Sequence, residues 1–222
     1  MKKIWSWGFA AEIFPDILKC LPVTVGSTLV AFVVAALVGL VLAVLLQTKI
    51  KWLRKILLIL VDLIRSTPLL VQLYVIYYVL PNYGLLLTPF VTGVIGLGIH
   101  YSTYLSEVYR SGIDAIPKGQ WEAADCLGLT KLQTWVKIVI PEAIPPILPV
   151  IGNYLITMFK ETPILSAISL IEILQEAKIL GSRSFRYIEG FTIVGVLFMV
   201  VSLVASFIVV RVTTVVTRKY SM

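Results

Sequence analysis

Long runs of apolar residues dominate the chain and predict five membrane-spanning helices. A helix needs about 20 mostly apolar residues to cross a bilayer. The runs that qualify cover residues 23–46, 56–80, 89–109, 142–161 and 190–212. They lack the two-residue alternation of apolar and polar positions that marks a strand of a membrane barrel. The pattern predicts an all-α integral membrane protein in which residues 1–222 form one transmembrane domain.

Composition agrees with a membrane protein rather than a nucleic-acid-binding one. The chain is 59% hydrophobic and 14% charged, whereas about a quarter of the residues in a soluble domain are charged. The net charge is +7, but basic residues also collect in cytoplasmic loops and near lipid headgroups. We therefore expect a lipid bilayer as partner and no nucleic acid.

The distribution of basic residues predicts the orientation. With five spans, loop 47–55, segment 110–141 and the C-terminal tail share one side, and they hold eleven Lys and Arg. The other side, which includes the loop 160–189, holds seven. Because basic residues favour the cytoplasmic side, we expect the C-terminus inside and the N-terminus outside. Residues 1–20 show no clean pattern of a removable signal peptide.

Metal binding and a disulfide are both unexpected. His100 is the only histidine, and Cys20 and Cys126 match no metal-binding spacing. The predicted topology also puts the two cysteines on opposite sides of the membrane, so we expect both to be free.

A charged, alanine-rich stretch, "WEAADCLG" at residues 121–128, lies in the predicted cytoplasmic segment. "QWEAADCL" is long enough for two helical turns, with Glu122 in the first turn, where the helix dipole favours a carboxylate. Gly128 is a natural left-handed C-cap because it has no Cβ. By these criteria alone, the short helix suits an interfacial helix on lipid headgroups and a docking knob for a protein partner equally well.

A second helix is predicted directly after this turn. Thr130 can cap it, with Gln133 three residues later as a capping box, and Pro141 is expected to end it. The segment of about 110–141 is thus predicted to be a helix, a sharp turn and a helix.

The residues of this segment resemble the EAA motif of bacterial ABC importer permeases. Glu122-Ala123-Ala124 is followed by three residues, Gly128, nine residues, Ile138, one residue and Ile140-Pro141. Ile140 stands where leucine is usual. "RSTPLLVQL" (65–73, with Ser66 in place of glycine), residues 104–124 and "KETPILSAI" (160–168) resemble the polar amino acid branch of that family. The resemblance covers about residues 20–215.

The resemblance implies a bacterial, multi-pass permease of the cell (inner) membrane that works by alternating access. It implies ABC ATPase subunits, an extracellular or periplasmic solute-binding protein and a second permease, either a copy or a sister chain, as partners. The short helix would insert into a cleft on the ATPase. The coupling residues are Trp121, Glu122, Ala123, Ala124, Leu127 and Gly128, of which Trp121 and Leu127 are added for their apolar character. The chain has no phosphate-binding loop, so we expect no catalytic residue and no cofactor here, with ATP and Mg on the ATPase.

Polar residues within the predicted spans are candidates for a substrate pathway. In the second span, Asp62, Arg65, Ser66 and Gln72 lie beside the helix-breaking Pro68, although Asp62 and Arg65 at i,i+3 also suit a structural ion pair. In the fourth span, Asn153, Thr157 and Glu161 are spaced by four and are predicted to share one face; interhelical packing is the alternative. His100 suits either a packing or a pathway role. Glu107, Arg110 and Asp114 are expected to form ion pairs at the membrane surface.

The function that these features favour is ATP-driven import of a polar amino acid or a related zwitterionic solute, of which ectoine is one candidate. An ATP-independent channel or facilitator and a membrane scaffold are the competing hypotheses. Neither of them explains a cytoplasmic helix built to receive force from a partner.

Overall fold

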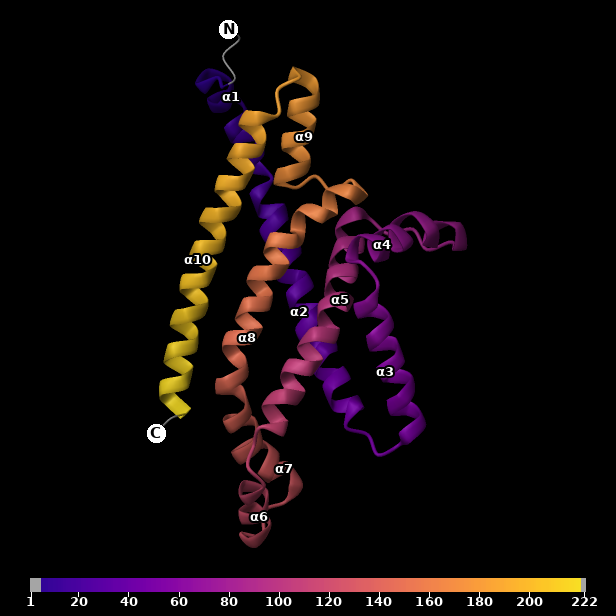
Figure 1. Ribbon diagram of the computed structural model, residues 1–222, viewed down its shortest axis with the longest axis vertical. Coiled ribbons are helices and arrows are strands. Elements are labelled where there is room, and N and C mark those ends of the chain that lie inside the picture. Colours follow the sequence, from indigo (N-terminus) through magenta and orange to yellow (C-terminus); the bar gives the residue numbers. More distant parts are fainter. Residues whose placement is uncertain (1–4, 221–222) are drawn as a thin grey trace.

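The computed structural model describes residues 5–220, and throughout this range the regular elements are helical (Figure 1). The α-helices are α1 (Trp7–Lys19), α2 (Leu21–Leu46), α3 (Lys51–Ser66), α4 (Leu69–Tyr74), α5 (Pro89–Asp114), α6 (Lys118–Cys126), α7 (Lys131–Thr134), α8 (Ile140–Glu161), α9 (Ile173–Ser184) and α10 (Ile188–Tyr220). Two π-helical turns (Val75–Val79 and Trp135–Val139) and two 3₁₀ helices (Leu80–Tyr83 and Thr162–Ile168) join or extend them.

Among the described residues, three helical stretches are long and apolar enough to cross a membrane. They are Trp7–Leu46, Lys131–Ile168 and Ile188–Arg218, and the bent pair of α3 and α4 makes a fourth if it is counted as one span. The 26-residue α5 is long enough to span but is not among them. It carries many polar residues, and several of these, such as Thr103 and Ser106, are fully buried against the protein. The count of five spans stays a prediction.

The core forms where α2 packs closely against α5. Ala31 and Ala35 on α2 are fully buried, and a Cβ added at Gly39 would lie 2.9 Å from the carbonyl oxygen of Ser102. Small residues of this kind let two helix backbones approach in a membrane protein. The α2–α5 pair is thus the frame against which α8 and the bent α3–α4 unit are placed.

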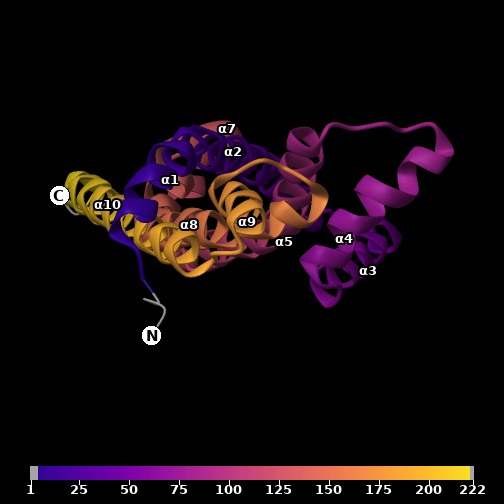
Figure 2. The same cartoon turned by 90° about the horizontal axis from the view of Figure 1, so that it is seen from above.

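The predicted second span, residues 56–80, is broken rather than continuous. The helices on either side of Thr67 and Pro68 meet at 101°. Thr67 is extended, with φ −100° and ψ 135°, because the proline ring disfavours helical geometry in the residue before it. The expected kink is therefore a sharp corner, and the segment from α4 to Tyr83 extends away from the rest of the molecule (Figure 2).

Two regions that the sequence analysis left without helices are helical. The predicted loop 160–189 contains the 3₁₀ helix Thr162–Ile168 and α9, and α1 precedes the first span. They pack on α10 through a cluster of Ile13, Ile17, Ile173, Ala177 and Val194. Both α1 and α9 are amphipathic and shorter than a span, so a search for long apolar runs does not find them.

The helices place the three basic regions at one end of the molecule. The α2–α3 loop, α6 and the C-terminal end of α10 lie together at the lower end in Figure 1, and α1 and α9 lie at the upper end. The three regions therefore share one end, as predicted, and the side of the membrane on which that end lies stays a prediction. Cys20, between α1 and α2, and Cys126, the last residue of α6, are both free.

Candidate functional site

The short helix α6 begins earlier than predicted. Its first residue is Lys118 and its N-cap is Pro117, so Glu122 is the fifth residue and the first turn contains no acid. The prediction that Glu122 interacts with the helix N-terminus was wrong. Pro117, whose φ is fixed near the value that leads into a helix, starts the helix before the charged stretch.

The turn after α6 confirms the predicted role of Gly128. Its φ is +66°, in the left-handed region that only glycine adopts without strain. Its N–H donates to the carbonyl of Asp125 at 3.0 Å, and the N–H of Leu129 donates to the carbonyl of Ala124 at 3.1 Å. No atom lies within 4 Å of a Cβ built at Gly128, so backbone conformation, not packing, requires glycine here.

The helix after the turn starts as predicted but does not end at Pro141. Thr130 and Gln133 form the capping box, with N–H to side-chain oxygen distances of 2.9 and 3.3 Å. Beyond α7 the chain passes through the π-helical turn Trp135–Val139 into α8, where Pro141 occupies the first turn. Pro141 needs no hydrogen-bond acceptor there, so the helical stretch continues from Lys131 to Ile168.

The predicted coupling residues divide into two groups by exposure. Ala124 is fully buried, and Trp121 packs edge-to-face on Trp135 with ring centroids 5.8 Å apart. These two hold α6 against its own chain. Glu122, Ala123, Leu127 and Gly128 are exposed, so α6 and the turn after it present a surface that is free to contact another protein.

Arg65, at the corner of the bent span, reaches across to α5. One Nη atom lies 3.8 Å from Glu107, the other donates to the carbonyl of Thr103, and the guanidinium lies 5.1 Å from the ring centroid of Tyr104. Asp62 and Ser66 are exposed, so the alternative of an Asp62–Arg65 pair is wrong for this structure.

The ion pairs expected at the inner end of α5 are present in part. Glu107 pairs with Arg110 at 2.9 Å as well as with Arg65. Asp114 is exposed.

Gln72 closes the corner that Pro68 opens. Its Nε2 donates to the carbonyls of Ile64 and Thr67, at 2.6 and 3.1 Å. The end of α3 leaves such carbonyls without helical partners. The Oε1 of Gln72 lies 3.2 Å from Nδ1 of His100 on α5. Gln72 therefore fixes the bend and joins it to α5.

Aromatic rings connect this corner to Glu161 at the end of α8. The rings of His100, Tyr101, Tyr104 and Tyr154 have neighbouring centroids 5.4–6.0 Å apart. The hydroxyl of Tyr101 donates to Oε2 of Glu161 at 2.6 Å. We call this group, with Arg65 and Gln72, the polar–aromatic cluster. Sequence reasoning missed its three tyrosines, which recur along α5 and α8 beside residues that it did select.

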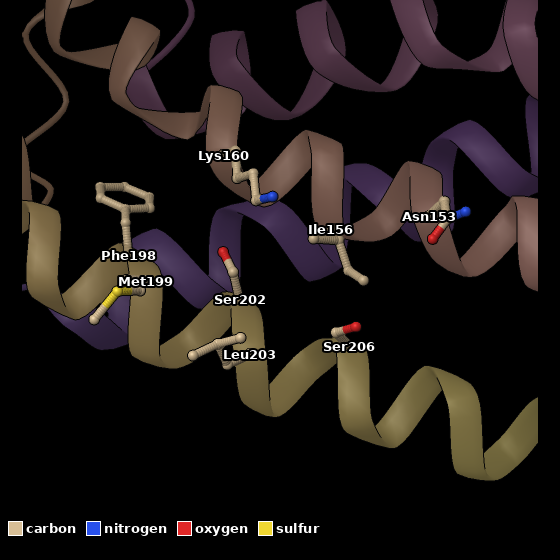
Figure 3. Close-up of a pocket in the computed structure, with 8 residues that line it drawn as sticks. All are labelled: Asn153, Ile156, Lys160, Phe198, Met199, Ser202, Leu203 and Ser206. Atoms are coloured by element: carbon tan, nitrogen blue, oxygen red, sulfur yellow. The ribbon is translucent and has the colours of Figure 1, made fainter.

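Asn153, Thr157 and Glu161 do not share one face. Asn153 lines a groove between α8 and α10 (Figure 3), Thr157 is exposed and donates to the Asn153 carbonyl at 2.9 Å, and Glu161 contacts α5. Along an α-helix, a residue four positions further on points about 40° beyond the direction of the first, because four residues make slightly more than one turn. Two such steps carry Glu161 away from Asn153.

Comparison with known proteins identifies the family. Residues 35–220 match the family described as binding-protein-dependent transport system inner membrane component. A probable amino-acid ABC transporter permease of Sinorhizobium fredii is 41% identical over 201 residues, which cover 90% of this chain and 87% of that protein. An arginine transport system permease of Bacillus subtilis is 35% identical over 207 residues, covering 90% and 93%.

Solved structures agree with this assignment. A chain from the crystal structure of an amino acid ABC transporter with histidines superposes with a TM-score of 0.86 at 33% identity, covering 97% of this chain and 99% of that one. A chain of the methionine ABC transporter MetNI in an inward-facing conformation, at 21% identity and a TM-score of 0.71 over 96% and 100%, shares the fold. The chain therefore belongs to the family of binding-protein-dependent inner membrane transport components, and it is a transmembrane permease subunit of an ATP-driven ABC importer rather than an ATP-independent channel or a scaffold.

Proposed function

We propose that this permease imports a polar amino acid, and that the polar–aromatic cluster is part of its route. The observation that carries the proposal is the pair of opposite charges, Arg65 and Glu161, at the two ends of a chain of aromatic rings. Arg65 is suited to a substrate carboxylate and Glu161 to an ammonium or amidinium group, and tyrosine rings attract cations. Relatives named for the transport of arginine and of L-cystine support the substrate class.

The charge balance of the cluster favours a substrate with a positive group. Arg65 already has Glu107 within 3.8 Å. The polar contact of Glu161 in the described structure is the neutral hydroxyl of Tyr101. A carboxylate within a membrane needs a partner or water, and a substrate cation supplies one. His100, joined to Gln72, positions the rings beside it.

The proposal includes an orientation and a set of partners. The N-terminus lies outside and the C-terminus inside, with α5 counted as the third of five spans, because the basic regions gather at the end that carries α6. The exposed surface of α6 inserts into an ABC ATPase that binds ATP and Mg. A second permease, the same or a sister chain, completes the pathway, and an external solute-binding protein delivers the substrate.

Glu161→Gln tests the proposal because it removes the charge and keeps the shape. A charge-assisted hydrogen bond is worth about 1.5–3 kcal/mol, so ATP-driven uptake of radiolabelled L-arginine into liposomes holding the assembled complex should fall by about tenfold or more. L-Glutamine, L-cystine and ectoine are measured in parallel to define the substrate. Glu142→Gln, an exposed carboxylate in the first turn of the same helix, is the control. Unchanged uptake in the Glu161 variant contradicts the assigned role, since exposed pairs are worth about 0–1 kcal/mol.

A further inference from the structure

A second polar site lies on the other side of α8, in the groove between α8 and α10. The groove has a volume of about 470 Å³ (Figure 3). Its lining comprises Asn153, Ile156, Lys160, Phe198, Met199, Ser202, Leu203 and Ser206. Just beyond Asn153 the helices touch, since a Cβ added at Gly152 would lie 2.3 Å from Val209. The groove is thus bounded at one end by close packing.

Ser202 has a hydroxyl with no partner. Its side chain is buried, with 8% exposure, and no hydrogen-bonding atom of the described residues reaches its Oγ. Thr192 and Thr214, also on α10, donate to their own backbone four residues back, at 2.7 and 2.8 Å, whereas Thr213 likewise has no partner but does not line the groove. Because a buried hydroxyl normally finds a partner, Ser202 points to a hydrogen-bonding group that enters the groove.

Lys160 supplies a positive charge to the same place. Its side chain and that of Ser202 extend from facing helices into one part of the groove (Figure 3). Within the described structure Lys160 takes part in no ion pair, and the adjacent Glu161 is turned toward Tyr101. An ammonium group inside a membrane is costly unless a counter-charge or water accompanies it. Lys160, whose side chain is exposed, and Ser202 therefore offer an ammonium group and a hydroxyl donor that suit an anionic oxygen.

Depth decides which anion is available. Ser202 lies 14 residues after Ile188, the first residue of the 33-residue α10, which is about 21 Å along the helix. The groove is thus near the middle of this helix, and lipid phosphates lie at the edges of a hydrocarbon layer about 30 Å thick. A solute that passes through the protein reaches this depth, whereas a headgroup does not.

We propose that the groove is a carboxylate subsite of the transport route. Lys160 and Ser202 bind the carboxylate of the transported amino acid, and the Asn153 amide and the Ser206 hydroxyl bind its polar side chain. Asn153 and Lys160 are seven residues apart, about 10 Å along the helix, which suits a long polar amino acid. The subsite rests on the proposed function, because its ligand is the substrate named there, and it gives that substrate's carboxylate a second binding position, at Lys160, distinct from Arg65 of the polar–aromatic cluster.

Paired probes with and without a carboxylate test the subsite. The purified permease–ATPase complex, without its binding protein, is titrated with L-arginine and with agmatine, its decarboxylated analogue. Lys160→Met should weaken L-arginine binding by about tenfold or more and leave agmatine binding within about twofold. Ser202→Ala should act in the same direction with a smaller effect. Lys160→Arg keeps the charge and should retain most of the preference for L-arginine.

Controls remove the same groups elsewhere. Thr192→Val deletes a hydroxyl of α10 that is used by its own backbone, and Lys49→Met deletes an exposed charge of the α2–α3 loop. Neither should change the ratio of the two affinities. The subsite is overturned if Lys160→Met weakens the binding of L-arginine and agmatine equally, or weakens neither. It is also overturned if Lys160→Met disrupts the pairing of two permeases and leaves the ratio of the two affinities unchanged, which would assign Lys160 to the contact with a second permease.

The proposed function can fail separately. If the wild-type complex binds none of L-arginine, L-glutamine and L-cystine, amino acid import is wrong and the subsite fails with it. In the alternative outcome, the wild type binds one of these amino acids more tightly than its decarboxylated amine. If Lys160→Met keeps the ratio of those two affinities, only the subsite is wrong.

Discussion

Glu172 is a single residue whose ionisation should affect stability. It is fully buried at the start of α9, where its Oε1 accepts from the N–H of Gln175 at 2.8 Å, and its Oε2 has no partner among the described residues. Burial raises the pKa of this carboxyl above its ordinary value of 4.5, against the opposing effects of the backbone N–H groups and of Lys178. Glu176 and Cys20 are the other titratable groups near it.

The raised pKa sets the direction of a pH effect. The folded state favours the protonated carboxyl, so its contribution to stability is complete below pH 4.5 and is lost as the pH rises through the folded-state pKa. A rise of one in the pKa on folding corresponds to about 1.4 kcal/mol of folding free energy. We expect the thermal unfolding midpoint of Glu172→Gln in detergent to exceed that of the wild type near pH 7, with the two converging toward pH 4. Glu176→Gln is the control; parallel curves for the Glu172 variant and the wild type would contradict the assignment.

Residue by residue, local chemistry was predictable and long-range partners were not. The capping role of Thr130 and the left-handed Gly128 depend on neighbours within four positions, and both were found from sequence. The spacing offered Arg65 an ion pair with Asp62 as one alternative, but Arg65 contacts Glu107 and Tyr104, some 40 residues away. Nothing in the local spacing fixes which turn of α5 faces the corner at Pro68.

At the scale of elements, the turn after α6 sets the direction of the coupling helix. Gly128→Val should uncouple ATP hydrolysis from transport without unfolding the protein. A side chain in the left-handed region costs about 1–2 kcal/mol, and since the space around Gly128 is open, the effect comes from the backbone alone. The measurement is the ratio of ATP hydrolysed to solute transported by the assembled complex in liposomes.

Gly119 provides the matched control for this variant. It lies in α6, the helix that precedes the turn at Gly128, has equally open surroundings and lacks a positive φ. Gly119→Val should therefore leave the ratio close to native. Transport at the native rate by the Gly128 variant would show that the turn does not position α6.

The elements themselves were predictable in proportion to their apolar length. The first and last spans contain long uncharged runs: the predicted span 23–46 lies within two residues of α2 at both ends, and the predicted span 190–212 begins two residues after the start of α10 but ends eight residues before the helix does. Helix α9, with mean hydropathy close to neutral and Glu172 as its cap, gives no such signal. Pro141 was read as a helix end because a proline breaks an α-helical ladder, but the π-helical turn before it already changes the hydrogen-bonding register.

At the scale of the whole molecule, the orientation is testable through its two cysteines. Cys126 is exposed on α6 and Cys20 lies between α1 and α2. In cells expressing Cys20→Ser, a membrane-impermeant thiol reagent added outside should not label Cys126. The same reagent should label it in inside-out vesicles. Strong labelling of intact cells would invert the topology and remove the ATPase-docking role of α6.

The corner at Pro68 leaves α3 shorter than the thickness of the bilayer. Helix α3 has 16 residues, about 24 Å at 1.5 Å per residue, whereas the hydrocarbon layer is about 30 Å thick. After the corner the chain runs nearly at right angles and adds little height. Such a hydrophobic mismatch costs fractions of a kcal/mol per Å. Because Gln72 ties this corner to His100, a thicker membrane should pull on the cluster itself, and the acyl-chain length of the surrounding lipid becomes a variable of the transport rate.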